Sequence, residues 1–135
     1  MVVQQTPIDR LLLIRLNPGD DLLRGIEQAV AEAGVRNGAI LSGVGSLKSY
    51  HYHVVETTNL PPGNTFVRGD GAYDLVNVNG MVMDGRVHAH LLFSDAEKAL
   101  GGHLEEGCRV LTFAMVVIAE TPDVKVTNWD QVGAL

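Results

Sequence analysis

The sequence has 135 residues, of which 46% are hydrophobic and 19% charged, and its formal net charge is −6 at pH 7. This length predicts a single domain, residues 1–135, which is long enough to bury a proper core and too short for two. The negative charge disfavours binding to phosphate backbones, and no apolar stretch approaches the roughly 20 residues needed to span a bilayer.

The first predicted elements are a strand and a helix. Arg10–Leu16 is predicted to be a strand, and the following Asn17–Gly19 is a turn signal. Asp20 can then cap a helix that runs to about Ala33, and Gly34 is expected to end it as a C-terminal cap. The apolar residues at helical spacing are Leu22, Leu23, Ile26, Ala29, Val30 and Ala33.

After this helix the hydrophobic pattern changes to a period of two or to short buried runs, which favours strands. Asp84 and Gly85, between two alternating runs, are the sharpest hairpin signal. Short helices or turns are expected at Asp95–Leu100 and His103–Glu106. The predicted strands are Gly38–Leu47, Tyr50–Glu56, Thr65–Arg68, Tyr73–Met83, Val87–Phe93, Cys108–Ala119 and Val124–Asn128.

Gly43 and Gly45 superficially suggest a nucleotide-binding loop. The dinucleotide fingerprint needs a third glycine three residues further on, at the start of a helix, where this chain has Lys48 followed by a predicted strand. We therefore interpret the two glycines as a bulge or a close backbone approach within a strand.

The run Val110–Ile118 is apolar on both faces, and a strand buried on both sides must be covered twice. The single long helix can cover one side of a mainly antiparallel sheet. The other side needs a second sheet layer or another subunit, so this pattern indicates an oligomer.

Cys108 is the single cysteine, which excludes an internal disulfide and fits a reducing compartment. Because it heads an apolar run, we expect it to be buried and inert. The early apolar run Leu11–Ile14 is short and has charged neighbours, which is not the pattern of a secretory signal. A cytoplasmic protein is therefore expected.

Three of the five histidines suggest a metal site. His88 and His90 alternate with apolar residues, so they share one face of a predicted strand, with Cα atoms roughly 6.5–7 Å apart. His103 follows Gly101 and Gly102, a pair that can bring the backbone in closely. Three neutral imidazoles favour zinc or a similar late divalent ion over magnesium or calcium. The alternative is a polar, solvated strand face with no ligand role.

Two further groups of side chains each have a functional and a non-functional interpretation. His51 and His53 lie on one face of their strand, and they could supply further ligands or a stacking surface. We favour a solvated histidine face there. Glu105 could act as a general base or orient a histidine from outside the ligand set, or it could belong with Glu106 to a solvated acidic turn.

Several motifs, taken in order, make this chain resemble the Plants and Prokaryotes Conserved domain family (PCC, also PPC or DUF296), as a stand-alone prokaryotic member. The resemblance covers nearly the whole chain, and its last two motifs together are highly specific. The motifs are the helix Leu22–Gly34, Ile40–Leu47, Tyr73–Gly80, Val87–His90 and Gly101–Cys108.

This resemblance implies an α+β fold in which a largely antiparallel sheet is packed by one long helix and short helices and assembles as a homotrimer. It also implies that His88, His90 and His103 bind a divalent metal, with zinc the first choice. Plant members contact DNA through an AT-hook with an Arg-Gly-Arg-Pro core. This sequence contains no such segment, so we do not expect specific DNA binding by this chain alone.

Two main functions follow from these observations. The first is a trimeric metal-binding domain that senses or acts on a small molecule at an open metal position. The alternative is a DNA-associated regulatory or oligomerisation module in which the histidines are structural. A metal-dependent hydrolase is a third option, which would need a base such as Glu105 near the ion.

Overall fold

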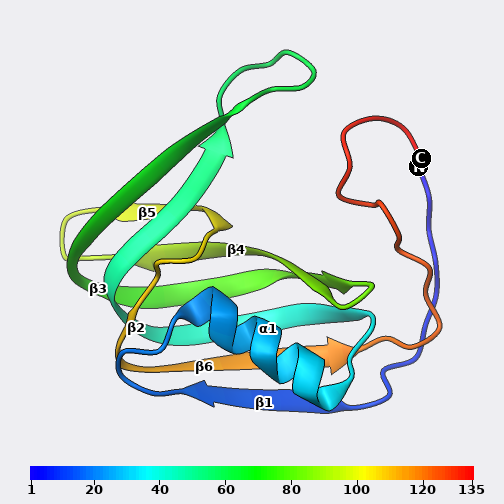
Figure 1. Cartoon of the computed structure of the whole chain (residues 1–135), viewed down its shortest axis with the longest axis horizontal. Helices are drawn as coiled ribbons and strands as arrows, with labels where there is room; N and C mark the ends of the chain where they lie inside the picture. Colours follow the sequence, from blue (N-terminus) through cyan, green and yellow to red (C-terminus); the bar gives the residue numbers. More distant parts are fainter.

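The computed structural model describes residues 1–135 and contains one helix and six strands (Figure 1). The elements are β1 (Leu11–Leu16), α1 (Leu22–Ala33), β2 (Gly38–Val55), β3 (Asn64–Met83), β4 (Arg86–Ser94), β5 (Ala99–Leu104) and β6 (Val110–Glu120). The strands form one sheet in the order β1-β6-β2-β3-β4-β5, and every pairing is antiparallel. The predicted mainly antiparallel sheet with a helix on one side is thus confirmed.

Helix α1 begins and ends close to where the sequence predicts. Its N-cap is Asp21, one residue later than predicted, and the Asp21 carboxylate accepts a hydrogen bond from the Arg24 backbone N–H. Gly34 ends the helix in the left-handed conformation, with φ of 69°. The buried face of the helix packs on the sheet, and each fully buried aliphatic side chain contributes about 1.5–3 kcal/mol. These side chains are Leu22, Ile26 and Val30.

The predicted short helices are absent, and so is the last predicted strand. Residues 95–98 form the turn that was the alternative to a helix, whereas Ala99, Leu100 and His103 lie within β5, because this segment finds strand partners on both sides. Val124–Asn128 is not a strand. Both edges of β6 are already paired, one with β1 and the other with β2, so Val124–Asn128 cannot add to β6 as a further strand.

Strands β2 and β3 are each longer than predicted, because Gly38–Leu47 joins Tyr50–Glu56 and Thr65–Arg68 joins Tyr73–Met83. A register shift between Leu47 and Ser49 bends β2 without breaking it. The far ends of β2 and β3 project as a two-stranded arm (Figure 1). Gly45 lies at another register shift of β2, as expected for a bulge.

The bend allows β2 to pair with β5 as well as with β3 and β6. Because β3 pairs with β4 and β4 with β5, these strands form a closed ring of β2, β3, β4 and β5. Ring closure brings residues that are about fifty positions apart in the sequence onto adjacent strands. This closure positions the histidines.

Cys108 is fully buried, as predicted, and burial raises the pKa of its thiol to about 11. The thiol is therefore protonated and inert at neutral pH. Its neighbour Gly107 donates a backbone hydrogen bond to the Asp21 carboxylate, with 2.7 Å between the two atoms. The start of α1 thus holds the loop that follows β5.

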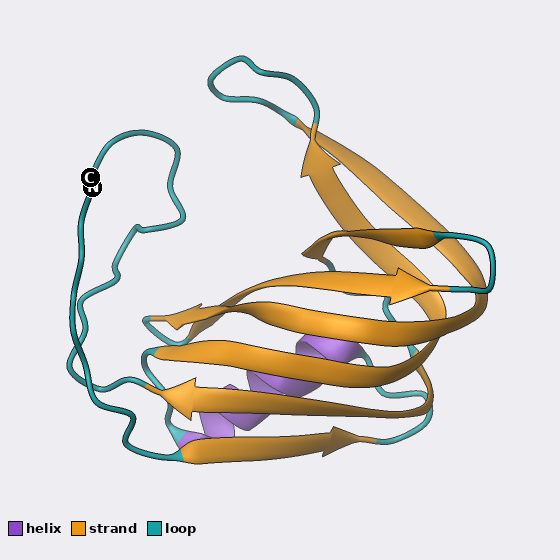
Figure 2. Cartoon of the chain, turned by 180° about the vertical axis from the view of Figure 1, so that it is seen from behind, coloured by secondary structure: helices purple, strands orange, loops and turns teal.

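The sheet face opposite α1 carries no helix (Figure 2). Large apolar side chains leave that face on several strands and remain substantially exposed in the single chain. They include Leu13 on β1 at 79%, Met115 on β6 at 45% and Leu92 on β4 at 44%. The structure also has no helix with the length and hydropathy required to cross a bilayer.

Candidate metal centre

Four of the five histidines meet where the ring of strands closes. His53 on β2 lies directly opposite His103 on β5, and His103 lies directly opposite His90 on β4. Directly opposed residues of neighbouring strands point to the same face, so the three imidazoles form a row across the sheet. His88, two residues before His90, shares that face.

The rings lie close together around His103. Their centroids are 4.3 Å from His103 for His53, 4.7 Å for His88 and 5.4 Å for His90. The centroids of His88 and His90 are 5.5 Å apart. The rings of the three histidines selected from the sequence therefore lie near one another, but the ligand atoms that group most tightly are those of His53, His103 and Glu105.

His103 approaches the pair as part of a strand, and Gly101 and Gly102 make this approach sterically possible. A Cβ atom on Gly101 would lie 2.2 Å from the Leu91 carbonyl oxygen, and one on Gly102 would lie 2.5 Å from the His53 carbonyl oxygen. Strand β5 therefore fits between β4 and β2 only without side chains at these two positions. This close approach is the role predicted for the glycine pair.

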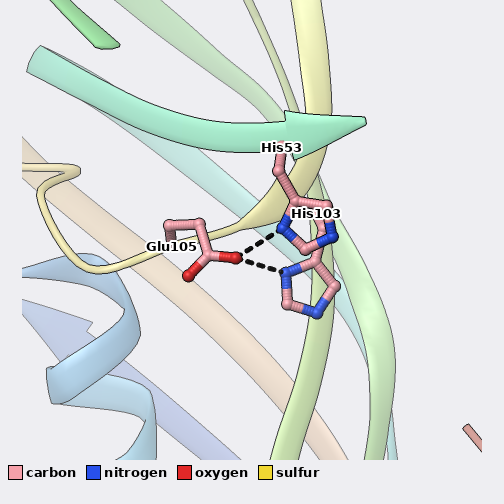
Figure 3. A group of neighbouring side chains, drawn as sticks. All are labelled: His53, His103 and Glu105. Carbon is pink, nitrogen blue, oxygen red and sulfur yellow. Dashed lines mark hydrogen bonds and ion pairs between the residues drawn. The ribbon is translucent and has the colours of Figure 1, made fainter. Parts of the chain in front are cut away.

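Glu105 directly contacts the histidine row. Its Oε1 lies 2.5 Å from the His53 Nδ1, whose N–H can donate to it, and 3.2 Å from the His103 Nδ1 (Figure 3). The Glu105 side chain is only 24% exposed, so the solvated-turn interpretation is wrong for this residue. Glu106, by contrast, lies on the surface and pairs with Arg24.

The Nδ1 of His103 is buried and has no hydrogen-bond partner, because the Glu105 oxygen, although close, does not meet hydrogen-bond geometry. The nearest ligand atoms of His53, His103 and Glu105 all lie within 4.8 Å of one another. An unpartnered buried polar atom costs free energy, so it marks a position where a further ligand would be stabilising.

Two imidazoles of the cluster, those of His90 and His103, have lowered pKa values that favour their neutral form. Partial desolvation by its neighbours lowers the pKa of His90, which remains exposed on one side, and repulsion from His88 and His53 lowers it further. Burial also lowers the pKa of His103, with repulsion from His53 and His88 adding to it and Glu105 opposing it. Neutral imidazole is the form that binds metal ions.

His53 shows what the sequence-based analysis missed. The solvated-face interpretation is wrong for His53, which stacks on His103, and also for His51, which is buried and donates to the Glu106 carbonyl at 2.7 Å. The only local signal was the His-x-His alternation. The pairing of β2 with β5 that gives His53 its place is non-local.

The cluster is open to solvent through a depression of about 380 Å³. Four histidines line it, together with two valines of the projecting arm and a glycine of β5. The lining residues are His53, Val54, Val55, His88, His90, Gly102 and His103. A small molecule therefore has direct access to the histidines.

A small antiparallel sheet with one helix and a solvent-accessible polyhistidine cluster at its ring closure defines the structural class of this chain. The family model for the Plants and Prokaryotes Conserved (PCC) domain matches residues 3–122. The chain belongs to this family, as its motifs indicated.

Solved structures share this fold. A plant- and prokaryote-conserved protein from Pyrococcus horikoshii is 29% identical, with a TM-score of 0.74 over 93% of this chain and 87% of that one. A metal-containing protein from Archaeoglobus fulgidus is 21% identical, with a TM-score of 0.78 over 90% of this chain and 86% of that one. At that identity, the second likeness concerns the fold alone.

Among curated proteins, the bifunctional protein GlmU from two Synechococcus strains is 31% identical over 111 residues in one strain and 29% identical over 113 in the other. The matched region covers 82% and 83% of this chain but only 17% of each GlmU sequence.

Proposed function

We propose that this protein is a metal-binding PCC domain whose histidine cluster holds a late divalent ion, zinc first, and that it senses or acts on a small molecule there. The observation that carries this proposal is the convergence of three imidazoles and one carboxylate on a fourth imidazole, that of His103, whose buried Nδ1 has no hydrogen-bond partner. A bound cation would satisfy that atom.

The donor set fits such an ion. Nitrogen donors with one carboxylate and no thiolate suit zinc and its late-transition neighbours better than calcium or magnesium. The residues that would hold the ion are His88, His90 and His103, with His53 or Glu105 beside them. The fold shared with the metal-containing Archaeoglobus fulgidus protein supports this proposal.

When bound, such an ion would supply a Lewis acid facing the open depression. The protein's own groups prepare the site. Glu105 accepts the His53 Nδ1–H, which fixes the orientation of that ring and leaves its other nitrogen as a lone-pair donor. The same carboxylate could accept a proton from a small molecule that enters the depression.

We further propose that the chain works as a homotrimer in the cytoplasm. The uncovered sheet face supports assembly, because contiguous exposed apolar surface usually marks an interface. The metal centre borders this face, since His90 and Leu92 leave the same side of β4 and Leu92 is 44% exposed.

The experiment is elemental analysis of untagged protein after zinc supplementation and dialysis. We expect one bound late divalent ion per chain, lost in His103→Ala and in His90→Ala. His90 is surface-exposed, so its variant should remain folded by circular dichroism. His51→Gln is the matched control, because it removes the one imidazole outside the cluster. Metal-free wild-type protein, or full metal content in both cluster variants, would overturn the proposal.

A further inference from the structure

The C-terminal segment beyond the family match contacts the metal centre. After β6 the chain leaves the sheet and passes the turn between β3 and β4 (Figure 1). There the Asp130 carboxylate accepts two hydrogen bonds from the Arg86 guanidinium, at 3.0 and 3.1 Å. The same carboxylate lies 3.4 Å from the Nδ1 of His88. The family model matches residues 3–122, so Asp130 lies beyond the matched region.

Several contacts hold this segment on the domain. The Val126 side chain is buried, and the Thr127 hydroxyl donates to the Asp84 carboxylate at 2.7 Å. The Asn37 side chain donates to the Val124 carbonyl. The Asp130 side chain is only 10% exposed, so its carboxylate is held in place against β4.

A carboxylate that accepts a hydrogen bond from one ring nitrogen of a histidine determines the protonation of the other ring nitrogen. The Nδ1–H of His88 can donate to Asp130, which keeps the proton on Nδ1 and leaves the Nε2 lone pair free as a metal ligand. The bidentate pair with Arg86 keeps the carboxylate in the acceptor position. Arg86 and His88 leave the same face of β4, so one carboxylate reaches both.

We propose that Asp130 is a positioning residue of the metal centre, which fixes the tautomer and orientation of His88 from a segment beyond the residues that the family model matches. This inference rests on the proposed metal-binding function. It makes the C-terminal segment a determinant of metal affinity in this particular chain.

The test compares zinc affinity, by chelator competition, in the wild-type full chain, Asp130→Ala and Val132→Ala. Loss of a group that orients a metal ligand costs about 10–100-fold in affinity, which is the loss expected for Asp130→Ala. Val132→Ala changes an exposed side chain of the same segment and should keep the wild-type affinity. Asp130→Glu should recover part of the loss. In a His88→Ala background, Asp130→Ala should have no further effect, because the two residues act through one ring.

A second readout needs no metal. The ¹⁵N shifts of the His88 ring in metal-free protein should report the Nδ1–H tautomer, and Asp130→Ala should shift this ring toward the other tautomer. Failure of the wild type to bind zinc would overturn the proposed function. The tautomer measurement tests the positioning role of Asp130 independently of zinc binding. Unchanged zinc affinity in folded Asp130→Ala, or an unchanged His88 tautomer, would overturn the positioning role.

Discussion

Replacing Gly101 by alanine tests how closely the metal centre depends on the packing of β5. The added Cβ would lie 2.2 Å from the Leu91 carbonyl oxygen, whereas ordinary contacts begin near 3.4 Å. The obstacle is backbone in a paired strand, so β5 itself must move by about 1 Å. Overpacking of this kind costs about 1–3 kcal/mol, and functional constellations tolerate displacements of only about 0.5 Å. We therefore expect lower stability together with loss of metal binding.

The assays are urea unfolding followed by circular dichroism and the metal content of the protein that remains folded. Ala99→Ser, at an exposed position of the same strand, is the matched control and should change neither quantity. Gly101→Ala with wild-type stability and one ion per chain would refute the argument that β5 must lie this close to β4.

Three other predictions concern pH, assembly and DNA. Because the pKa values of His90 and His103 are lowered in the folded state, the unfolded chain binds more protons than the folded one. Metal-free protein should therefore lose stability as the pH falls below about 6.5, which urea unfolding would show as a falling midpoint. A midpoint that does not change with pH would contradict the lowered pKa values. Sedimentation equilibrium at micromolar concentration should show a trimer. Leu13→Lys, on the uncovered sheet face, should dissociate this trimer without unfolding the chain, and a monomeric wild type would refute the proposed assembly. DNA binding by this chain should be weak and without sequence preference, as the net charge of −6 implies, and nanomolar operator binding at physiological salt would contradict this.

Local signals were enough to predict the helix and the His88–His90 face. The helix follows from apolar spacing between Leu22 and Val30 together with Gly34. The histidine face follows from alternation with Ala89, Leu91 and Phe93, all of which are buried. The failure to predict β5 has a non-local cause. The sequence 99–104 contains two glycines and lacks strand-favouring residues, and it becomes a strand only because β4 and β2 flank it.

The same non-local pairing of β5 decides which residues make up the candidate metal centre. His53 and His90 are 37 positions apart, and neither sequence neighbourhood identifies the other. Both become neighbours of His103 only when β5 pairs on its two sides. The closure of the ring and the assembly of the site are thus one structural step. A ligand that binds the assembled cluster stabilises the closed ring by its binding free energy, because the unfolded chain offers no equivalent arrangement. Under the proposed function, metal affinity and the stability of β5 are therefore linked, and a substitution that weakens one should weaken the other.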